Sequence, residues 1–206
     1  SKAATAALMQ HADLVVATGS QANVRMAHTS GTPAFGVGAG NVTVIVDESA
    51  DLQAAASLIR QSKTFDNATS CSSENSVIID ASVYDAMLAA LTDEGGLMLD
   101  DQDKQRLQDL LWHAGKLSAV FSGKDAAQMM QVAQIGDTQT PAAPRFLMVE
   151  ETGFGSKHPF SGEKLAPVLT VYKASDFADA KRIASSIYDY MGAGHSVGLH
   201  TTQAGR

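Results

Sequence analysis

Hydrophobic residues along this chain follow two spacings that alternate from one end of the sequence to the other. Short apolar runs are typical of strands, and the longer segments between them are rich in residues that favour helices. The runs predict strands over residues 13–18, 33–37, 42–47, 76–80, 145–150, 167–173 and 195–201. The longer segments predict helices over residues 2–12, 21–30, 48–65, 82–92, 101–112, 124–134 and 175–190. Strands that alternate with helices favour an α/β fold with a mainly parallel sheet.

Two local signals add detail to this pattern. Ser49 is predicted to cap the helix over 48–65, with Asp51 favourable in its first turn. The stretch GDTQTPAAP at 136–144 predicts a proline-rich connection between two elements.

A glycine-rich stretch divides the chain. The glycines of GVGAGN at 36–41 separate two predicted strands, where the chain can pass from one sheet to another. We therefore expect one domain over 1–40 and a second over 41–206. Residue 1 enters a helix without a preceding segment, and the sequence stops just after a strand, so we also expect a piece of a longer protein.

The composition disfavours several classes of function. The 206 residues are 45% hydrophobic, which is enough for a sizeable core. A net charge of −7 and a pI near 5.2 disfavour nucleic-acid binding, because a phosphate backbone gains little from an acidic surface. No apolar run approaches the roughly 20 residues that span a membrane, and no signal peptide is evident. With one cysteine, which excludes an internal disulfide, these features predict a soluble, cytoplasmic protein.

Several short motifs do not support a site. Gly36 and Gly38 suggest the dinucleotide fingerprint G-x-G-x-x-G, but Asn41 occupies the place of its third glycine and a strand follows instead of a helix. The S-x-x-K match at 161–164 lacks the companion motifs of penicillin-binding proteins. The six histidines show no zinc-like spacing with the cysteine, so no metal site is predicted.

Two loops carry candidate chemistry. The stretch ATGS at 17–20 leads from a strand into a helix, whose free N–H groups and dipole suit a pyrophosphate. An ordinary N-cap at Ser20 explains this stretch about as well. The only cysteine, Cys71, lies among small polar residues in FDNATSCSSENSV at 65–77. A lone cysteine is most often a small buried hydrophobe, but this loop does not look like a core, and an accessible thiolate is a nucleophile.

Four segments together resemble the aldehyde dehydrogenase superfamily, in the same order and at matching spacing. They are VVATGS, GVGAGNVTVIVDESADL, FDNATSCSSENSVIID and FSGEKLAPVLTVYK, and the similarity spans essentially the whole chain. It is nearest to the CoA-acylating branch, which includes acetaldehyde, succinate-semialdehyde and sulfoacetaldehyde dehydrogenases. The resemblance implies the end of a Rossmann-type cofactor domain over 1–40. It also implies an α/β catalytic domain, truncated at its C-terminus, over 41–206.

The resemblance implies a role for each of five residues. Cys71 matches the catalytic nucleophile, which attacks an aldehyde carbonyl to give a thiohemiacetal that then loses hydride to a nicotinamide. Gly19 and Ser20 match the turn that faces the cofactor pyrophosphate, and the backbone near Gly38 lies by the nicotinamide amide. Glu163 matches the glutamate that hydrogen-bonds the nicotinamide ribose, although without the resemblance it reads as a solvated surface acid.

One departure from the superfamily favours acyl transfer to coenzyme A. The hydrolytic branch has ELGGK where this chain has GVGAG, so that Gly36 stands in place of the glutamate that activates water. The thioacyl-enzyme is then expected to last until the thiol of coenzyme A attacks it. The resemblance thus implies an NAD- or NADP-dependent, CoA-acylating enzyme that oxidises an aldehyde, and a homo-oligomer for the full-length protein.

Three alternatives stay open. The protein is a hydrolytic aldehyde dehydrogenase if another group activates water, a non-catalytic fragment or interaction domain if half its cofactor site is lost, or a redox-sensing thiol protein. As to the substrate, the stretches TGSQANVR and CSSENS look most like the sulfoacetaldehyde enzymes. A sulfonate needs cations or N–H donors, which Lys157, His158 and His195 offer.

Overall fold

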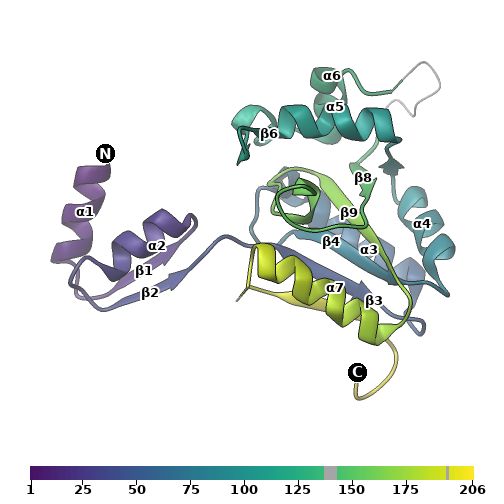
Figure 1. The fold of residues 1–206 in the computed structure, drawn as a ribbon, viewed down its shortest axis with the longest axis horizontal. Helices are drawn as coiled ribbons and strands as arrows, with labels where there is room; N and C mark the ends of the chain where they lie inside the picture. Colours follow the sequence, from purple (N-terminus) through teal and green to yellow (C-terminus); the bar gives the residue numbers. More distant parts are fainter. Residues whose placement is uncertain (137–142, 194) are drawn as a thin grey trace.

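The computed structural model describes residues 1–136, 143–193 and 195–206. The chain forms a small lobe at the N-terminus and a larger lobe, and one extended segment joins them (Figure 1). The small lobe holds a two-stranded sheet, and the larger lobe holds a six-stranded sheet with a short hairpin beside it. Every strand pair within the six-stranded sheet is parallel. The predicted α/β fold with a mainly parallel sheet is therefore confirmed.

The small lobe contains α1 (Lys2–His11), β1 (Val15–Thr18), α2 (Gln21–His28) and β2 (Ala34–Val37). Strands β1 and β2 run parallel, with Val15 opposite Ala34. Alternation along β1 buries Val15 and Ala17 against Ala27 of α2, and it leaves Val16 71% exposed on the opposite face. One face of this small sheet is therefore packed by helices and the other is open.

The larger lobe has its strands in the order β10-β3-β4-β9-β8-β5. Its strands are β3 (Val42–Val46), β4 (Glu74–Asp80), β5 (Gly96–Met98), β8 (Phe146–Glu150), β9 (Val168–Ala174) and β10 (Val197–His200). Its α-helices are α3 (Leu52–Thr64), α4 (Tyr84–Asp93), α5 (Asp101–Leu111), α6 (Ala126–Ala133) and α7 (Phe177–Tyr190). The hairpin is β6 (Trp112–His113) with β7 (Lys116–Leu117), and the 3₁₀ turns are η1 (Phe65–Ala68), η2 (Ala119–Phe121) and η3 (Pro159–Ser161).

Helices cover both faces of the large sheet. Successive strand residues point to opposite faces, so Val44 and Val77 pack with α3 and α4, whereas Ile45 and Ile78 pack with α7. A separate cluster joins β8 and the start of β9 to α5 and α6, with Phe160 in its centre. Because both faces of the sheet are covered, the sequences of the central strands are unbroken apolar runs and do not alternate between apolar and polar residues.

The structure corrects one predicted helix start. Helix α3 begins after Asp51, whose side chain accepts a hydrogen bond from the backbone N–H of Ala54 at 3.0 Å. Ser49 is therefore not the cap. Its hydroxyl instead donates to Asp47 at 2.7 Å, because it belongs to a separate polar cluster at the end of β3. Of the predicted proline-rich connection over 136–144, residues 137–142 lie outside the described residues.

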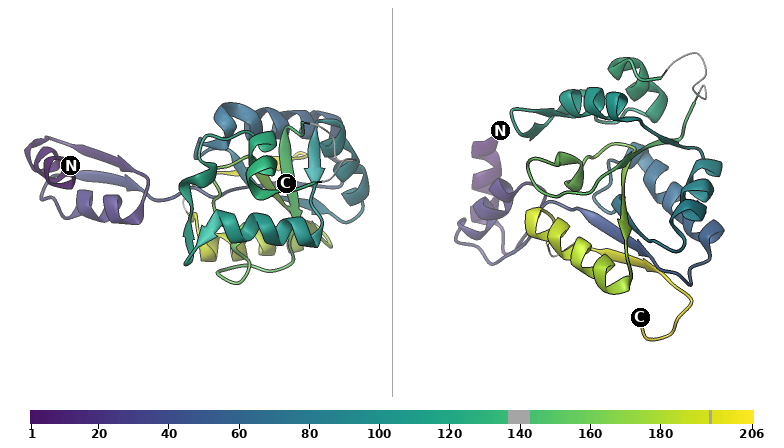
Figure 2. Two further views of the ribbon diagram at one scale, coloured as in Figure 1. Left: turned by 90° about the horizontal axis from the view of Figure 1, so that it is seen from above. Right: turned by 45° about the vertical axis from the view of Figure 1, so that its right-hand side comes forward.

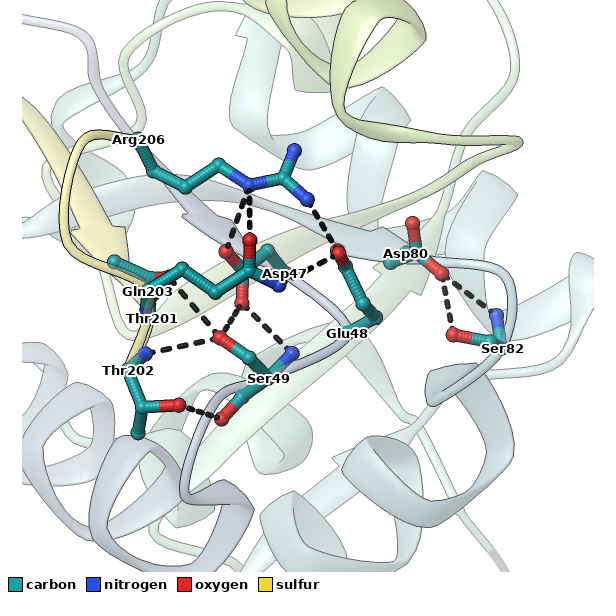
Figure 3. Close-up of polar contacts among 9 residues, drawn as sticks. All are labelled: Asp47, Glu48, Ser49, Asp80, Ser82, Thr201, Thr202, Gln203 and Arg206. Carbon is teal, nitrogen blue, oxygen red and sulfur yellow. Dashed lines mark hydrogen bonds and ion pairs between the residues drawn. The ribbon is translucent and has the colours of Figure 1, made fainter.

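That polar cluster fastens the last segment of the chain to the end of β3 (Figure 3). The backbone N–H of Thr202 donates to the Ser49 hydroxyl at 2.9 Å, and the Thr202 hydroxyl donates to the Ser49 carbonyl at 2.9 Å. Arg206 forms an ion pair with Glu48 and lies 3.8 Å from a buried oxygen of Asp47. These contacts hold β10 in place as the edge strand beside β3. Throughout the described residues, the helices are too short or too polar to cross a membrane.

Candidate active site

A cavity of about 340 Å³ lies where the two lobes meet. The left view in Figure 2 shows the small lobe beside the larger one, joined to it through the single connecting segment after β2. The five residues predicted for the site, Gly19, Ser20, Gly38, Cys71 and Glu163, all line this cavity. The fold thus brings together residues from both lobes that are far apart in the sequence. What each residue does there stays a prediction.

Cys71 lies in an exposed turn, residues 70–73, between η1 and the amino end of β4. The backbone N–H of Ser73 donates to the carbonyl of Ser70 at 3.1 Å and closes this cysteine turn. Gly40 passes so near that a Cβ on it would lie 2.7 Å from the Cys71 carbonyl oxygen and 3.3 Å from a carboxylate oxygen of Glu163. Position 40 therefore requires glycine, because a side chain there would displace the cysteine turn.

The segment that leads into the cysteine turn is strained. Asp66, Asn67 and Ala68 have φ of 48°, 50° and 58°, a left-handed conformation that residues other than glycine rarely adopt. Hydrogen bonds hold them in place. The Asp66 carboxylate accepts from the Thr69 hydroxyl at 2.7 Å, and the Asn67 side chain donates to the carbonyl of Gly123 at 2.9 Å. Surrounding contacts thus fix the backbone that presents Cys71.

Ala68→Gly is expected to cost less stability than Ala56→Gly, which makes the same change inside α3. Both alanines are buried, and both substitutions remove a methyl group and loosen the unfolded chain. Only Ala68→Gly relieves a left-handed alanine, so the two losses in free energy of unfolding should differ by about 1–2 kcal/mol. Urea denaturation of both variants measures the difference, and equal losses would contradict the strain at Ala68.

Glu163 extends from a loop that is tied down on several sides. The Lys164 ammonium donates to the carbonyls of Phe160 and Gly162 at 2.7 and 2.9 Å. The backbone N–H of Lys164 donates to the side-chain oxygen of Asn75 at 3.0 Å. Because Lys164 is 1% exposed, water competes little for these bonds. The loop therefore holds the Glu163 carboxylate at the cavity wall.

Buried lysines adjoin this carboxylate. Lys63, in the last turn of α3, is 1% exposed, and its ammonium donates to the backbone oxygen of Glu74 at 2.9 Å. Burial lowers the pKa of Lys63 from 10.5 to about 7, and the carboxylates of Glu74 and Glu163 partly oppose this. Burial likewise raises the pKa of Glu163, with Lys164 and Lys63 opposing. The ionisable groups behind the cavity are therefore electrostatically coupled.

The free energy of unfolding is expected to rise between about pH 7 and pH 10.5 through Lys63. In this range the unfolded chain binds the lysine proton and the native state does not, so raising the pH favours the native state. Lys63→Met should remove this part of the slope. Urea denaturation across the range provides the measurement, with the exposed Lys116→Met as the control variant. An unchanged slope in Lys63→Met would exclude the depressed pKa.

The turn after β1 has the geometry of an anion site. Gly19 has φ of 109°, and no atom lies within 4 Å of the Cβ that it lacks, so a ligand can approach the backbone. Ser20 caps α2, since its hydroxyl accepts from the backbone N–H of Asn23 at 3.3 Å. Ser20 is thus the N-cap, and it lines the cavity together with Gly19. That this turn receives a pyrophosphate stays a prediction. Across the cavity, a Cβ on Gly38 would lie 2.3 Å from the Gln21 amide, so a side chain at this position would displace the Gln21 side chain.

Gly36, predicted to stand in place of the water-activating glutamate, does not face the cavity. A Cβ on Gly36 would lie 2.5 Å from Val24 and 2.9 Å from His28, both on α2, so Gly36 faces the interior of the small lobe. Because side chains alternate along β2, the next residue, Val37, faces the other way and lines the cavity. Whether a carboxylate on β2 reaches the cavity therefore depends on which face of the strand it occupies.

The three candidate sulfonate contacts lie in different places. His195 lines the cavity, and its Nδ1 is buried without a hydrogen-bond partner among the described residues. His158 instead pairs with the buried carboxylate of Glu151 at 3.0 Å, away from the cavity. Lys157 does not line the cavity either. Sequence reasoning did not single out Leu165, which also lines the cavity with φ of 47°. Its unusual backbone has no signature in the sequence.

The fold and the cavity define a class: an α/β protein whose accessible cysteine shares a cavity with a helix start suited to a phosphate. Within the described part of the chain, no three His, Cys, Asp or Glu side chains are placed to hold a metal ion. The model of the aldehyde dehydrogenase family matches residues 1–137, and the chain belongs to this family.

Individual relatives agree with this membership. The chain is 58% identical over 202 residues to a sulfoacetaldehyde dehydrogenase (acylating) of Cupriavidus necator. The match covers 98% of this chain and 41% of that protein. An acetylating aldehyde dehydrogenase from Geobacillus thermoglucosidasius superposes with a TM-score of 0.93 at 38% identity, covering 98% of this chain and 45% of that one.

A third relative was crystallised with its reaction partners. It is a propionaldehyde dehydrogenase of Rhodopseudomonas palustris with CoA bound and an acylated cysteine. Its TM-score is 0.86 at 30% identity, covering 99% of this chain and 46% of that one. The chain thus spans less than half the length of the relatives it matches.

Proposed function

We propose that this chain is the nucleophile-bearing part of an NAD- or NADP-dependent, CoA-acylating aldehyde dehydrogenase. The observation that carries the proposal is that Cys71 and the helix start at Gly19 and Ser20 line one cavity. A thiol that forms a covalent intermediate and a phosphate-binding turn are the two parts that such an oxidation requires. In this proposal, residues 1–40 close a cofactor domain and residues 41–206 carry the catalytic chemistry.

The residues fit a nicotinamide dinucleotide. The open backbone at Gly19 and the N–H groups at the start of α2 suit its pyrophosphate. The Glu163 carboxylate, held by its loop, would accept hydrogen bonds from a ribose hydroxyl, and the backbone at Gly38 would adjoin the nicotinamide. When bound, the nicotinamide supplies the acceptor for hydride.

The chain's own residues perform the covalent steps. The Cys71 thiolate attacks the aldehyde carbon, a C–S bond forms, and the oxygen gains a negative charge that the Cys71 backbone N–H stabilises. Hydride leaves with its electron pair, the C=O bond forms again, and a thioester remains on Cys71. The CoA thiol then attacks this thioester and Cys71 leaves as a thiolate. His195, which lines the same cavity, accepts the CoA thiol proton.

Two features favour coenzyme A over water as the acyl acceptor. The cavity position nearest to the expected carboxylate is Val37, which cannot activate water. The Rhodopseudomonas relative holds CoA and an acylated cysteine in one structure. We further propose sulfoacetaldehyde as the aldehyde. The 58% identity to the Cupriavidus sulfoacetaldehyde enzyme supports this.

Product analysis with the full-length protein tests this function. The protein is supplied with sulfoacetaldehyde or acetaldehyde and with NAD or NADP, in the presence and absence of CoA. We expect reduced cofactor and acyl-CoA in equal amounts, little free acid without CoA, and a preference for sulfoacetaldehyde. Rapid free acid without CoA would favour the hydrolytic alternative. An absence of any aldehyde-dependent reduction would favour a non-catalytic protein, and equal rates with both aldehydes would exclude the sulfonate preference.

A further inference from the structure

Asn41 is a buried amide next to the site that has no part in the chemistry above. It follows Gly40 in the segment that joins the lobes, and its side chain is fully buried. Its Nδ2 donates to the carbonyl of Ser161 at 2.8 Å and to the carbonyl of Met191 at 3.2 Å. Both partners are carbonyl oxygens, so only the NH₂ end of the side chain can face them. Leaving such a carbonyl without a donor in the interior is costly.

These two carbonyls belong to the two loops that carry cavity residues. Ser161 lies two positions before Glu163, and Met191 ends α7 four positions before His195. Packing enforces the second contact, because Gly192 has φ of 92° and a Cβ on it would lie 2.3 Å from the Asn41 Cβ. One carboxamide group therefore joins the interlobe segment, the Glu163 loop and the His195 turn.

We infer that Asn41 is a positioning residue for this site: its NH₂ group fixes Glu163 and His195 relative to Cys71 by bonding the loops that carry both. Gly40, the neighbouring residue, already touches the cysteine turn and Glu163. The Asn41 contacts extend this arrangement to His195. The kinetic consequences of this inference rest on the proposed function. Its structural consequences rest on the hydrogen bonds alone.

A second buried asparagine supplies the matched control. Asn75 is 3% exposed, and its Oδ1 accepts from the backbone N–H of Lys164 at 3.0 Å, whereas its Nδ2 makes only a 3.4 Å contact with Ser73. Replacing the NH₂ group by oxygen therefore preserves the important bond at Asn75 and removes both bonds at Asn41. Asn41→Asp and Asn75→Asp make the same chemical change with opposite expected results.

The kinetic test uses the full-length protein and three variants: Asn41→Asp, Asn41→Leu and Asn75→Asp. Both Asn41 variants should raise the KM for NAD(P) through Glu163 and slow acyl transfer to CoA through His195. A displacement of about 1 Å costs about 10²-fold, so we expect a loss of that order in kcat/KM. Of the two loops, Asn75 contacts only the Glu163 loop, so any effect of Asn75→Asp should be confined to the KM for NAD(P), with acyl transfer to CoA near that of the unmodified protein. Unchanged kinetics in both Asn41 variants, or an equal loss in Asn75→Asp, would overturn the inference.

A structural test stands apart from activity. Hydrogen exchange in the Asn41 variants should rise in the Glu163 loop and at the end of α7 together, whereas in Asn75→Asp it should not rise at the end of α7. If the Asn41 variants do not fold, the unmodified protein labelled with [¹⁵N]asparagine still gives an answer. The Asn41 NH₂ protons should exchange slowly with solvent, and fast exchange would refute the inference. Failure of the aldehyde assay with the unmodified protein would refute the proposed function and leave these results standing.

Discussion

Cys71→Ser is expected to reduce aldehyde-dependent formation of NAD(P)H by the full-length protein by about 10⁴-fold or more, in line with the loss seen when a covalent nucleophile is removed. A serine hydroxyl stays protonated at neutral pH and is a poor nucleophile without a base positioned to activate it. Cofactor binding should persist, because Gly19, Ser20 and Glu163, the residues proposed to hold the cofactor, are on other elements. Stopped-flow absorbance and equilibrium titration with NADH measure the two quantities separately.

The neighbouring serine provides the control. Ser70→Ala changes the same turn, and Ser70 contacts Ser72 through a side-chain bond at 2.8 Å without supplying the thiol. It should keep most of the activity. If Cys71→Ser retains turnover within tenfold of Ser70→Ala, the cysteine is not the nucleophile, and the redox-sensing alternative for this thiol gains support.

Val37→Glu is expected to convert part of the acyl transfer into hydrolysis. Val37 is 45% exposed and lines the cavity with Cys71, so a longer polar side chain fits without displacing the core. A carboxylate there can take a proton from a water molecule that attacks the thioester. General-base help is worth roughly 10²–10⁴-fold when well placed. Free acid formed in the absence of CoA, determined by mass spectrometry, reports the effect.

Two further substitutions isolate the base. The glutamine side chain of Val37→Gln has nearly the same shape as the glutamate of Val37→Glu but no negative charge, so this variant should leave hydrolysis slow. Gly36→Glu places the carboxylate toward α2, where even a Cβ meets Val24 at 2.5 Å, so it should lower stability and give no free acid. Equal hydrolysis by Val37→Glu and Val37→Gln would show that a carboxylate at this position does not control the acceptor.

The sequence was sufficient to predict most of the fold, since buried parallel strands give long apolar runs and the helices between them have a clear period. It was insufficient where the choice depends on tertiary contacts. Ser49 and Asp51 are both good caps, and Thr202, which is distant in sequence, engages Ser49 and leaves the capping role to Asp51. The strand β5 and the hairpin of β6 with β7 were also missed, because two or three residues are too short to show a period.

The candidate site could likewise be predicted only in part from the sequence. Cys71, Gly19, Ser20, Gly38 and Glu163 lie in recognisable motifs, and the structure places them around one cavity. The sequence could not show that Gly36 faces away from the cavity, because a one-residue shift along a strand reverses the face. The burial of Lys63 and the contacts of Asn41 could not be predicted for another reason. A buried lysine or asparagine looks like any polar residue until the fold shows what surrounds it.

The position of β10 beside β3 has a consequence for biosynthesis. Val44 of β3 pairs with Gly198 of β10. The ribosome therefore synthesises β10 more than 150 residues after β3, the strand beside which it lies. At typical elongation rates this delay is on the order of 10 s. During that time the backbone edge of β3, whose residues are all buried in the finished protein, has no partner. An open apolar edge is a template for pairing with other chains. Nascent chains stalled before residue 197 should therefore depend on chaperones for solubility, because β3 gains its second neighbour only when β10 arrives.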